Sequence, residues 1–384
     1  MMDFQGLNIL LLEGYGRQIL PYLRAFKALG CKTTVICNAK VDVGYVSRFA
    51  DHKILGVCDT ERYEESERCV CDIIKNGNYD VVVPMGDFAA TILANNKEEL
   101  SKYAKIAVND KERFLQALNK QQVMQVCMEN GIPCPKTLPR VSKVEQLDLS
   151  QLVFPLVVKP EADCGARGFH CFKTMEELLA FAEGQDLSGM VLQEYIPQSD
   201  RNMSCGLFID PDGTVKSAYT YISRRWYPIK GGTGTFNQLI DRPDMVEMCE
   251  KLAKLMGLTG TLGFDFVDDL RDGTPKLLEI NPRVLACAKI GFEAGLDQAR
   301  QLLEMAYGEP VTAMETSGKP VNIRMSQIDV LWFLKSPDRF RAQPSWFSCK
   351  NTKDQTFSWD DPLPWFAFLL RGLGRFGKET KARE

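Results

Sequence analysis

Three polar side chains, Asp265, Glu279 and Asn281, lie in a stretch whose pattern predicts a β-hairpin. Two apolar runs, 262–267 and 276–280, flank a polar segment of the composition that forms turns. If the two strands pair symmetrically and without a bulge, Asp265 lies directly opposite Glu279. Directly opposed carboxylates have Cβ atoms roughly 5 Å apart and repel each other unless a cation lies between them. The hairpin therefore predicts a cation site.

A hard divalent ion fits this donor set. Two carboxylates and an amide supply oxygen ligands of the kind that Mg²⁺ or Mn²⁺ prefers, and substrate phosphates commonly complete such a site. Strand alternation also predicts that Leu277 shares the face of Asp265, while Leu278 lies on the opposite face with Phe264 and Phe266. The alternative is an ordinary hairpin whose rim charges point into water.

Composition narrows the classes of protein to consider. The 384 residues are 45% hydrophobic and 25% charged, as is typical of a globular protein with two or three compact domains. Lys and Arg total 47 against 50 Asp and Glu, a net charge of −3, so the basic excess of a nucleic-acid-binding protein is missing. We therefore expect no nucleic-acid partner.

The chain is expected to be cytoplasmic. Its first residues lack the pattern of a signal peptide, and no apolar run is long enough to predict a transmembrane segment. The 13 cysteines are scattered, which favours reduced thiols over a disulfide framework. With only two histidines, His52 and His170, the chemistry is expected to depend on lysine, arginine and carboxylates.

The N-terminal part reads as the opening of a doubly wound sheet. An apolar run at 7–12, a Gly14-Tyr15-Gly16 turn, a helical pattern and a second apolar strand at 33–37 form a βαβ unit. The turn lacks the full G-x-G-x-x-G pattern, so it predicts either a structural turn or, less specifically, a dinucleotide site. Farther on, residues 111–130 have the pattern of one amphipathic helix.

A second group of residues has the properties of a phosphate site. Lys159 ends an apolar strand and is followed by a loop of small residues and glycines up to Gly168. Backbone N–H groups of such a loop can approach an anion, while the lysine supplies a point charge. About thirty residues later, a strand runs through Gln193 into an irregular segment, whose exposed backbone could hold an adenine ring. A mobile surface loop beside a solvated lysine is the alternative.

Taken in this order, the motifs resemble the ATP-grasp superfamily, and more narrowly its carboxylate–amine ligases related to carbamoyl phosphate synthase. This resemblance implies an α/β and α+β chain in three parts. Residues 1–110 would form a Rossmann-like domain that precedes the ATP-grasp fold. Residues 111–310 would form the ATP-grasp domain, with a small nucleotide lobe at about 135–195 and a large lobe at about 196–310. Residues 311–384 would form an aromatic-rich C-terminal extension.

The resemblance also assigns roles to residues. It implies phosphate contacts for Lys120 and Lys159, metal binding by the hairpin acids and Asn281, and a bracing role for Arg283 at the transferred phosphate. Two departures stand out, because Asp265 replaces a glutamate common in relatives and the usual ribose glutamate is absent. The residues implied at the nucleotide are Lys120, Lys159, Asp163, Gly165, Arg167, Gly168, Gln193, Glu194, Tyr195 and Ile196, with Asp200 or Asn202 at the ribose.

The activity implied is that of an ATP- and Mg²⁺-dependent, ADP-forming ligase. A small carboxylate would be activated as an acylphosphate and coupled to an amine, and Arg224, Arg225 and Gly234 would line the substrate pocket. A small-molecule kinase would use the same nucleotide site. A non-catalytic ATP-binding regulator is disfavoured, because the metal and phosphate positions carry competent residues. A homodimer is left open.

The C-terminal extension is the least informative part of the sequence. It is rich in aromatic residues and ends in a short apolar helical pattern with basic residues. Such a tail either packs against its own protein or lies peripherally on a membrane surface.

Overall fold

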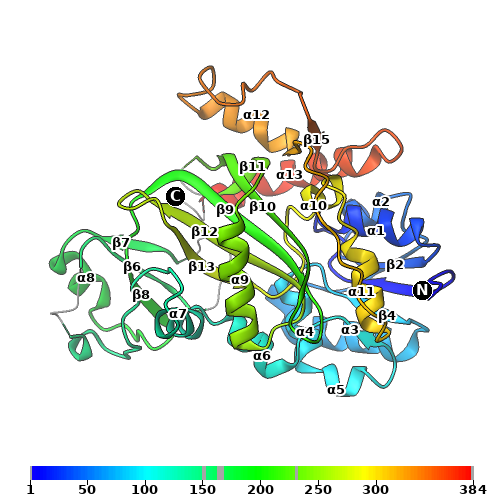
Figure 1. Ribbon diagram of the computed structural model, residues 1–384, viewed down its shortest axis with the longest axis horizontal. Coiled ribbons are helices and arrows are strands. Elements are labelled where there is room, and N and C mark those ends of the chain that lie inside the picture. Colours follow the sequence, from blue (N-terminus) through cyan, green and yellow to red (C-terminus); the bar gives the residue numbers. More distant parts are fainter. Residues whose placement is uncertain (1, 149–152, 162–167, 230–231, 382–384) are drawn as a thin grey trace.

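The computed structural model describes residues 2–148, 153–161, 168–229 and 232–381. Three sheets organise this part of the chain (Figure 1). The N-terminal sheet lies at one end, a small three-stranded sheet lies at the other, and a large sheet lies between them. The sequence-based prediction of a parallel N-terminal sheet followed by an α+β part is confirmed.

The N-terminal sheet is parallel, with strand order β3-β2-β1-β4-β5. Its central strands are apolar on both faces because helices cover both sides. Its strands are β1 (Asn8–Leu11), β2 (Lys32–Cys37), β3 (His52–Leu55), β4 (Val81–Val83) and β5 (Lys105–Ile106). The accompanying helices are α1 (Ile19–Ala28), α2 (Val43–Val46), η1 (Thr60–Arg62), α3 (Tyr63–Asn76), α4 (Asp87–Asn95) and α5 (Lys97–Leu100).

The small sheet is antiparallel, with strand order β7-β6-β8. Lys159 lies near the end of its central strand, paired with Val191 on β8. One face packs on the helix that follows β7, which gives this lobe its own core around Leu156, Val158 and Leu178. Its elements are η2 (Val144–Gln146), β6 (Leu156–Pro160), β7 (His170–Phe172), α8 (Met175–Ala182) and β8 (Met190–Glu194).

The large sheet has strand order β13-β12-β9-β10-β11-β14-β15. Helices α7 and α9 cover the apolar face of its first strands, where Phe264 and Phe266 are fully buried. The strands are β9 (Gln198–Ile209), β10 (Val215–Tyr227), β11 (Thr233–Ile240), β12 (Gly260–Asp269), β13 (Pro275–Asn281), β14 (Asn322–Arg324) and β15 (Thr352–Asp354). The helices of this part are α6 (Lys111–Leu118), α7 (Lys120–Glu129), α9 (Pro243–Met256), α10 (Lys289–Glu293) and α11 (Gln298–Ala306).

The β12–β13 hairpin pairs Asp265 with Glu279, as predicted from symmetry. The assumption of a bulge-free hairpin is wrong, because the register shifts by one residue after Asp265, so that Phe266 pairs with Leu277. Leu277 is consequently buried in the core, and Leu278 is the extra residue and is only half-buried. The predicted faces of these two leucines are therefore exchanged.

This exchange predicts different costs for two neighbouring substitutions. Leu277→Ala should lower the free energy of unfolding by about 2–5 kcal/mol, because it opens a cavity beside Phe264 and Phe266. Leu278→Ala should cost clearly less, since its side chain is only half-buried. Urea unfolding of the two purified variants measures both values. Equal losses, or a larger loss for Leu278→Ala, would contradict this register.

The single helix predicted for 111–130 is two helices, α6 and α7, separated at Asn119. Asn119 has extended backbone angles, and its side chain accepts a hydrogen bond from the Gln122 N–H, so it is the N-cap of α7. Its amide also donates to Glu161 at 2.9 Å. The break makes Lys120 the first residue of α7, beside the end of β6.

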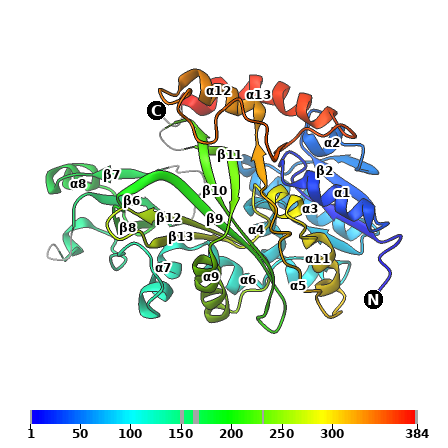
Figure 2. The same cartoon turned by 45° about the horizontal axis from the view of Figure 1, so that its top comes forward.

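The C-terminal extension is built into the rest of the protein. Its strands β14 and β15 continue the large sheet beyond β11, and its helices are α12 (Ser326–Lys335) and α13 (Leu363–Lys381). Figure 2 shows α12 and α13 along one side of the molecule, with α13 beside α2. There Arg371 pairs with Asp42, and Asp361 accepts a 2.6 Å hydrogen bond from Ser47. Within the described residues, no helix combines the length and apolar character needed to span a bilayer.

Candidate active site

The hairpin acids are held by partners from two other elements. The Ser204 hydroxyl on β9 donates to Asp265 Oδ1 at 2.6 Å, and the Asn281 amide donates to Asp265 Oδ2 at 2.9 Å. Lys120 Nζ lies 3.3 Å from Glu279 Oε2. The two acids therefore keep separate partners although their Cα positions are paired across the strands.

The raised pKa of Asp265 indicates that a cation would be favoured between Asp265 and Glu279. Burial, followed by the negative charge of Glu279, raises the pKa of Asp265 to about 7. A positive ion between the two carboxylates would oppose both effects, because it favours the charged forms. Within the described residues, no group of three or more His, Cys, Asp or Glu side chains gathers around a common point. The donor set is thus two carboxylates and one amide, and the remaining ligands of an ion would have to come from water or a substrate.

Lys159 approaches the same point from the small sheet. Burial lowers its pKa to about 8, the nearby charge of Glu279 opposes this shift, and the charge of Lys120 adds to it. Lys120 itself is only 8% exposed. Two lysines near one carboxylate give this part of the site an excess of positive charge, which an anion would neutralise.

Arg283 is fixed by a residue that the sequence analysis did not assign. Its Nε and Nη2 donate to the two carboxylate oxygens of Asp87 at 2.9 and 2.7 Å, and Nη2 also donates to Asn281 Oδ1 at 3.0 Å. Asp87 is the first residue of α4 and follows β4 after three intervening residues. A Gly-Asp pair at the carboxyl end of a parallel strand is a usual place for site residues, and this signal could have identified Asp87.

Residues 193–196, at the end of β8 and just after it, include groups that are hydrogen-bonded within the protein and one backbone donor that is not. Gln193 is buried and donates to the Thr137 hydroxyl at 2.8 Å, and the Glu194 carboxylate accepts from Lys136 N–H and pairs with Arg271. The Glu194 and Tyr195 N–H groups donate to backbone carbonyls. Among the described residues, the N–H of buried Ile196 has no acceptor. This backbone donor beside an apolar side chain is available to a ligand.

Several predicted nucleotide residues cannot be placed. Asp163, Gly165 and Arg167 lie outside the described residues, as does the side chain of Asp200. Gly168 is described, and its φ of 63° is the left-handed conformation that favours glycine. Asn202 lies on β9, paired with Val267, and its side chain is exposed.

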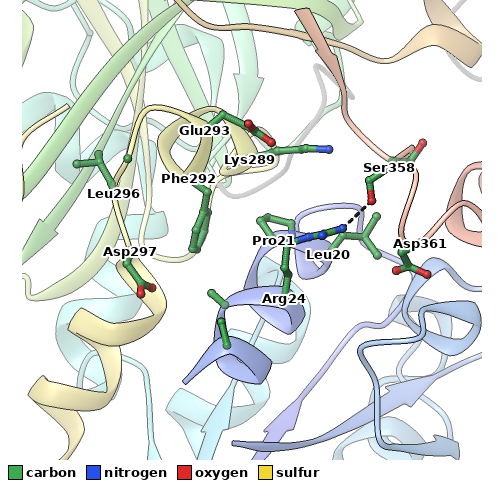
Figure 3. Close-up of a pocket in the computed structure, with 14 residues that line it drawn as sticks. Leu20, Pro21, Arg24, Lys289, Phe292, Glu293, Leu296, Asp297, Ser358 and Asp361 are labelled. Atoms are coloured by element: carbon green, nitrogen blue, oxygen red, sulfur yellow. Dashed lines mark hydrogen bonds between the residues drawn. The ribbon is translucent and has the colours of Figure 1, made fainter. Parts of the chain in front are cut away.

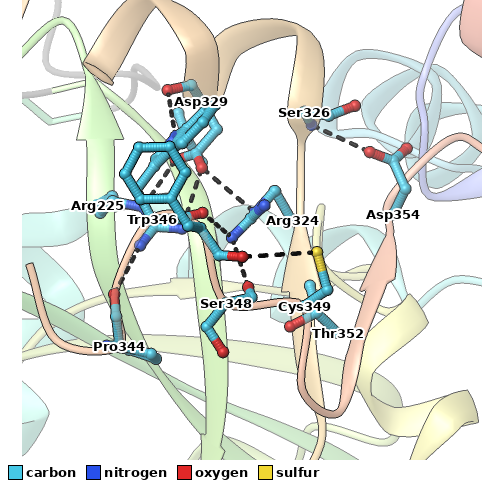
Figure 4. Close-up of polar contacts among 12 residues, drawn as sticks. Arg225, Arg324, Ser326, Asp329, Pro344, Trp346, Ser348, Cys349, Thr352 and Asp354 are labelled. Atoms are coloured by element: carbon cyan, nitrogen blue, oxygen red, sulfur yellow. Dashed lines mark hydrogen bonds and ion pairs between the residues drawn. The ribbon is translucent and has the colours of Figure 1, made fainter. Parts of the chain in front are cut away.

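Arg225, predicted as a substrate residue, is a buried structural residue instead. Its side chain is 1% exposed, and its Nε and Nη2 donate to Asp329 of α12 at 2.9 and 3.0 Å (Figure 4). A third donor, Nη1, is bound to the Pro344 carbonyl. Arg324 lies 3.4 Å from the same carboxylate. The guanidinium of Arg225 is therefore used to attach the C-terminal extension to β10, which argues against a substrate contact.

The other two predicted pocket residues lie on the same strands. Arg224 is half-buried, and its Nε donates to Gln238 at 3.0 Å. Gly234 lies on β11, where an added Cβ would be 2.7 Å from the Ser223 hydroxyl and 2.6 Å from Asn237 Oδ1. A side chain at 234 would have to displace both polar groups, so packing favours glycine there.

The Gly14-Tyr15-Gly16 turn is a packing turn. A Cβ on Gly14 would lie 2.3 Å from the Cys37 sulfur and 2.9 Å from the Ile36 carbonyl, so the backbone contacts β2 directly. Its N–H donates to Ile36 O and its carbonyl accepts from Gly44. Because strand β2 occupies the space beside Gly14, the structural interpretation of this turn is favoured over a dinucleotide site.

A separate hollow of about 360 Å³ lies where α1, α10 and the C-terminal extension meet. Figure 3 shows Arg24 donating to Ser358 across this hollow, with Lys289 and Phe292 on the α10 side. None of Lys120, Lys159, Asp265, Glu279 or Arg283 lines it. The hollow is therefore distinct from the group of charged side chains at the hairpin.

A comparison with protein families identifies the fold around the hairpin. Residues 117–287 match the family described as an ATP-grasp domain. This segment of the chain is thus assigned to the ATP-grasp superfamily. The matched range begins just before α7 and ends after Arg283, so it includes Lys120, Lys159 and the hairpin residues Asp265, Glu279 and Asn281.

The chain is also similar to a ligase. It is 29% identical over 247 residues to a D-aspartate ligase from Enterococcus faecium, and it spans 58% of the length of that protein. That match covers 58% of the present chain.

Solved structures share the fold at low sequence identity. The biotin carboxylase domain dimer of Hydrogenobacter thermophilus 2-oxoglutarate carboxylase, in complex with MgADP, has a TM-score of 0.64 and 20% identity, covering 79% of this chain and 70% of that one. L-amino acid ligase from Bacillus licheniformis has a TM-score of 0.61 and 16% identity, covering 79% and 74%. N5-carboxyaminoimidazole synthetase from Staphylococcus aureus, complexed with ADP, has a TM-score of 0.64 and 14% identity, covering 83% and 82%.

Proposed function

We propose that this protein is an ATP- and Mg²⁺-dependent ligase that couples a small carboxylate to an amine and releases ADP. The observation that carries the proposal is the convergence of Lys120, Lys159, Asp265, Glu279 and Arg283 beside one hairpin. Phosphoryl transfer depends mainly on positioning and charge neutralisation, which such a set of side chains can provide without histidine.

The two lysines are assigned to the phosphates of ATP. Lys120 and Lys159 come from different elements, α7 and β6, and both lie near the carboxylate of Glu279. The adenine ring is assigned to the segment 193–196, where the Ile196 N–H is available as a donor. Asp200 or Asn202 would contact the ribose, and the loop of Asp163, Gly165, Arg167 and Gly168 would cover the phosphates.

The donors at the hairpin fit a divalent ion. The raised pKa of Asp265 reflects burial and repulsion from Glu279, and both would be relieved by a cation. Asp265, Glu279 and Asn281 would hold Mg²⁺ or Mn²⁺, with water and phosphate oxygens as the remaining ligands. When bound, the ion would neutralise negative charge on the phosphates.

The reaction would proceed in two steps, and Arg283 would contact the transferred phosphate in both. A substrate carboxylate oxygen attacks the γ-phosphorus of ATP, ADP leaves, and an acylphosphate forms. The amine then adds to the acyl carbon, loses a proton, and displaces inorganic phosphate, so that an amide bond forms. Arg283, oriented by Asp87, braces the negative oxygens of the transferred phosphate in both steps.

The substrate class is narrowed by the relatives. The names of a D-aspartate ligase and an L-amino acid ligase favour an amino acid as at least one substrate of this protein. The test is a screen of amino acids and other small acids, alone and in pairs, for ADP release with mass spectrometry of the products. ADP release together with a condensed product supports the ligase. A phosphorylated acid without condensation would favour a kinase instead.

The pKa of Lys159 predicts a pH dependence of nucleotide binding. In the free protein this lysine is protonated below about pH 8 and neutral above it, and a bound triphosphate favours the protonated form. ATP affinity should therefore fall as the pH rises past about 8, and binding at about pH 9 should take up a proton.

Titration calorimetry in buffers with different ionisation enthalpies measures this uptake. Lys159→Arg keeps its charge at this pH, so its heat of ATP binding should no longer depend on the buffer. The same buffer dependence in wild type and Lys159→Arg would assign the proton to a group other than Lys159.

A further inference from the structure

Arg17 is a half-buried arginine at the carboxyl edge of the N-terminal sheet. It lies in the loop between β1 and α1, where the Gln18 side chain donates to the Met85 carbonyl after β4. Within the described residues, its guanidinium has neither an ion-pair partner nor a hydrogen-bond acceptor. Removing part of the hydration of a guanidinium costs free energy unless an opposite charge pairs with it. The position of Arg17 therefore favours binding of an anion.

Other arginines of this region have their own carboxylates. Arg283 is bound by both oxygens of Asp87, Arg225 by both oxygens of Asp329, and Arg371 by Asp42. The charge of each of these side chains is therefore balanced within the protein. Arg17 differs from them, because no carboxylate of the described residues balances its positive charge. A bound anion could balance it.

The surroundings of Arg17 place it beside the candidate active site. Burial lowers its pKa, and the charge of Arg283 adds to this effect. Its other electrostatic neighbours are the buried Tyr221 hydroxyl on β10 and the Cys287 thiol after β13, which are neutral at pH 7. No carboxylate is among the groups that act on it.

The position also separates Arg17 from the nucleotide lysines. Lys159 belongs to β6 at one end of the molecule, whereas α1 and the preceding loop lie at the other end, across the large sheet (Figures 1 and 2). Arg283 lies between these two groups, because it is bound both to Asn281 of the hairpin and to Asp87 of the N-terminal sheet. An anion at Arg17 would therefore lie on the side of Arg283 away from the nucleotide lysines.

We propose that Arg17 binds a carboxylate group of the small-molecule substrate, on the side of Arg283 away from the nucleotide. A planar carboxylate matches the fork of N–H donors on a guanidinium, and because the neighbouring Tyr221 and Cys287 are uncharged, the recognition depends on this one charge. The proposal rests on the ligase function above. The carboxylate belongs either to the acid that is activated or to an amine substrate that is itself an amino acid.

Kinetics of Arg17→Met distinguish these two sources. Loss of a charged hydrogen-bonding pair should raise the KM of one substrate by about tenfold to a hundredfold, while the KM of ATP changes little. A rise confined to the acid identifies the activated carboxylate, and a rise confined to the amine identifies an amino-acid acceptor. Arg17→Lys should recover part of the loss.

The matched control is Arg68→Met, which removes the same charge from the exposed face of α3. Unchanged KM values for both substrates in Arg17→Met would overturn the proposal.

A binding measurement tests Arg17 independently of ligation. Malonate should raise the thermal unfolding temperature of wild type and Arg68→Met more than malonamide at equal ionic strength, and this difference should vanish in Arg17→Met. Equal stabilisation of all three proteins, stabilisation by inorganic phosphate but not by malonate, or no effect of malonate on wild type would contradict the assignment. If wild type releases no ADP with any acid but shows the Arg17-dependent effect, the ligase function fails while the carboxylate site stands.

Discussion

Glu279→Gln is expected to lower ATP-dependent turnover by about a hundredfold to a thousandfold while the protein stays folded. The substitution keeps the size of the side chain but removes one of the two opposed carboxylates of the hairpin. It also leaves Lys120 without the carboxylate that lies 3.3 Å from its Nζ. Both the ion and the phosphates would then be held less firmly.

Stability should change little in the same variant. Glu279 is half-buried, and the loss of its pair with Lys120 is offset by the removal of its repulsion with Asp265. Asp272→Asn is the matched control, because it removes a carboxylate from the exposed turn of the same hairpin. ADP release by the purified proteins measures turnover. Near-normal turnover in Glu279→Gln would remove this residue from the mechanism.

Asp329→Ala is expected to lower the free energy of unfolding by about 3–5 kcal/mol. Asp329 is fully buried, binds Arg225 through two hydrogen bonds, accepts from the Thr235 hydroxyl at 2.8 Å and lies 3.4 Å from Arg324. Its removal leaves two guanidinium groups with low exposure and no nearby opposite charge.

Urea unfolding measures this loss. Asp338→Ala removes an exposed carboxylate from the same extension and should change stability by no more than about 0.5 kcal/mol. The double variant Arg225→Met with Asp329→Leu should be more stable than Asp329→Ala, because it removes the unpaired charge together with its partner. A loss below about 1 kcal/mol in Asp329→Ala would show that this buried pair does not hold the extension in place.

Local patterns predicted the parts of the fold that depend on near neighbours in sequence. The hairpin register followed from its apolar runs and turn residues, and the pairing of Asp265 with Glu279 is confirmed. The bulge at Leu278 was missed, because one extra residue in a strand leaves no periodic signal. The break at Asn119 was also missed, since the apolar spacing continues through it and only the capping contact marks the boundary.

Local sequence patterns do not predict contacts between residues that are far apart in the chain. The sequence predicts a substrate contact for Arg225 because an arginine pair is well suited to bind a carboxylate or phosphate through two hydrogen bonds. Its partner Asp329 lies 104 residues away, and nothing near either residue indicates the buried pair. The same holds for Arg283 and Asp87, which are 196 residues apart. Arg17 could be noticed only after the partners of the other arginines were known.

We infer that a substrate carboxylate is activated as an acylphosphate and that an amine then displaces the phosphate. The most direct measurement uses an acid labelled with ¹⁸O in its carboxylate, incubated with ATP, Mg²⁺ and the amine found in the screen. If the amine displaces phosphate from an acylphosphate, one labelled oxygen appears in the inorganic phosphate and the other stays in the amide product. Inorganic phosphate that carries no label, or label that remains in a stable phosphorylated acid, would exclude ligation through an acylphosphate.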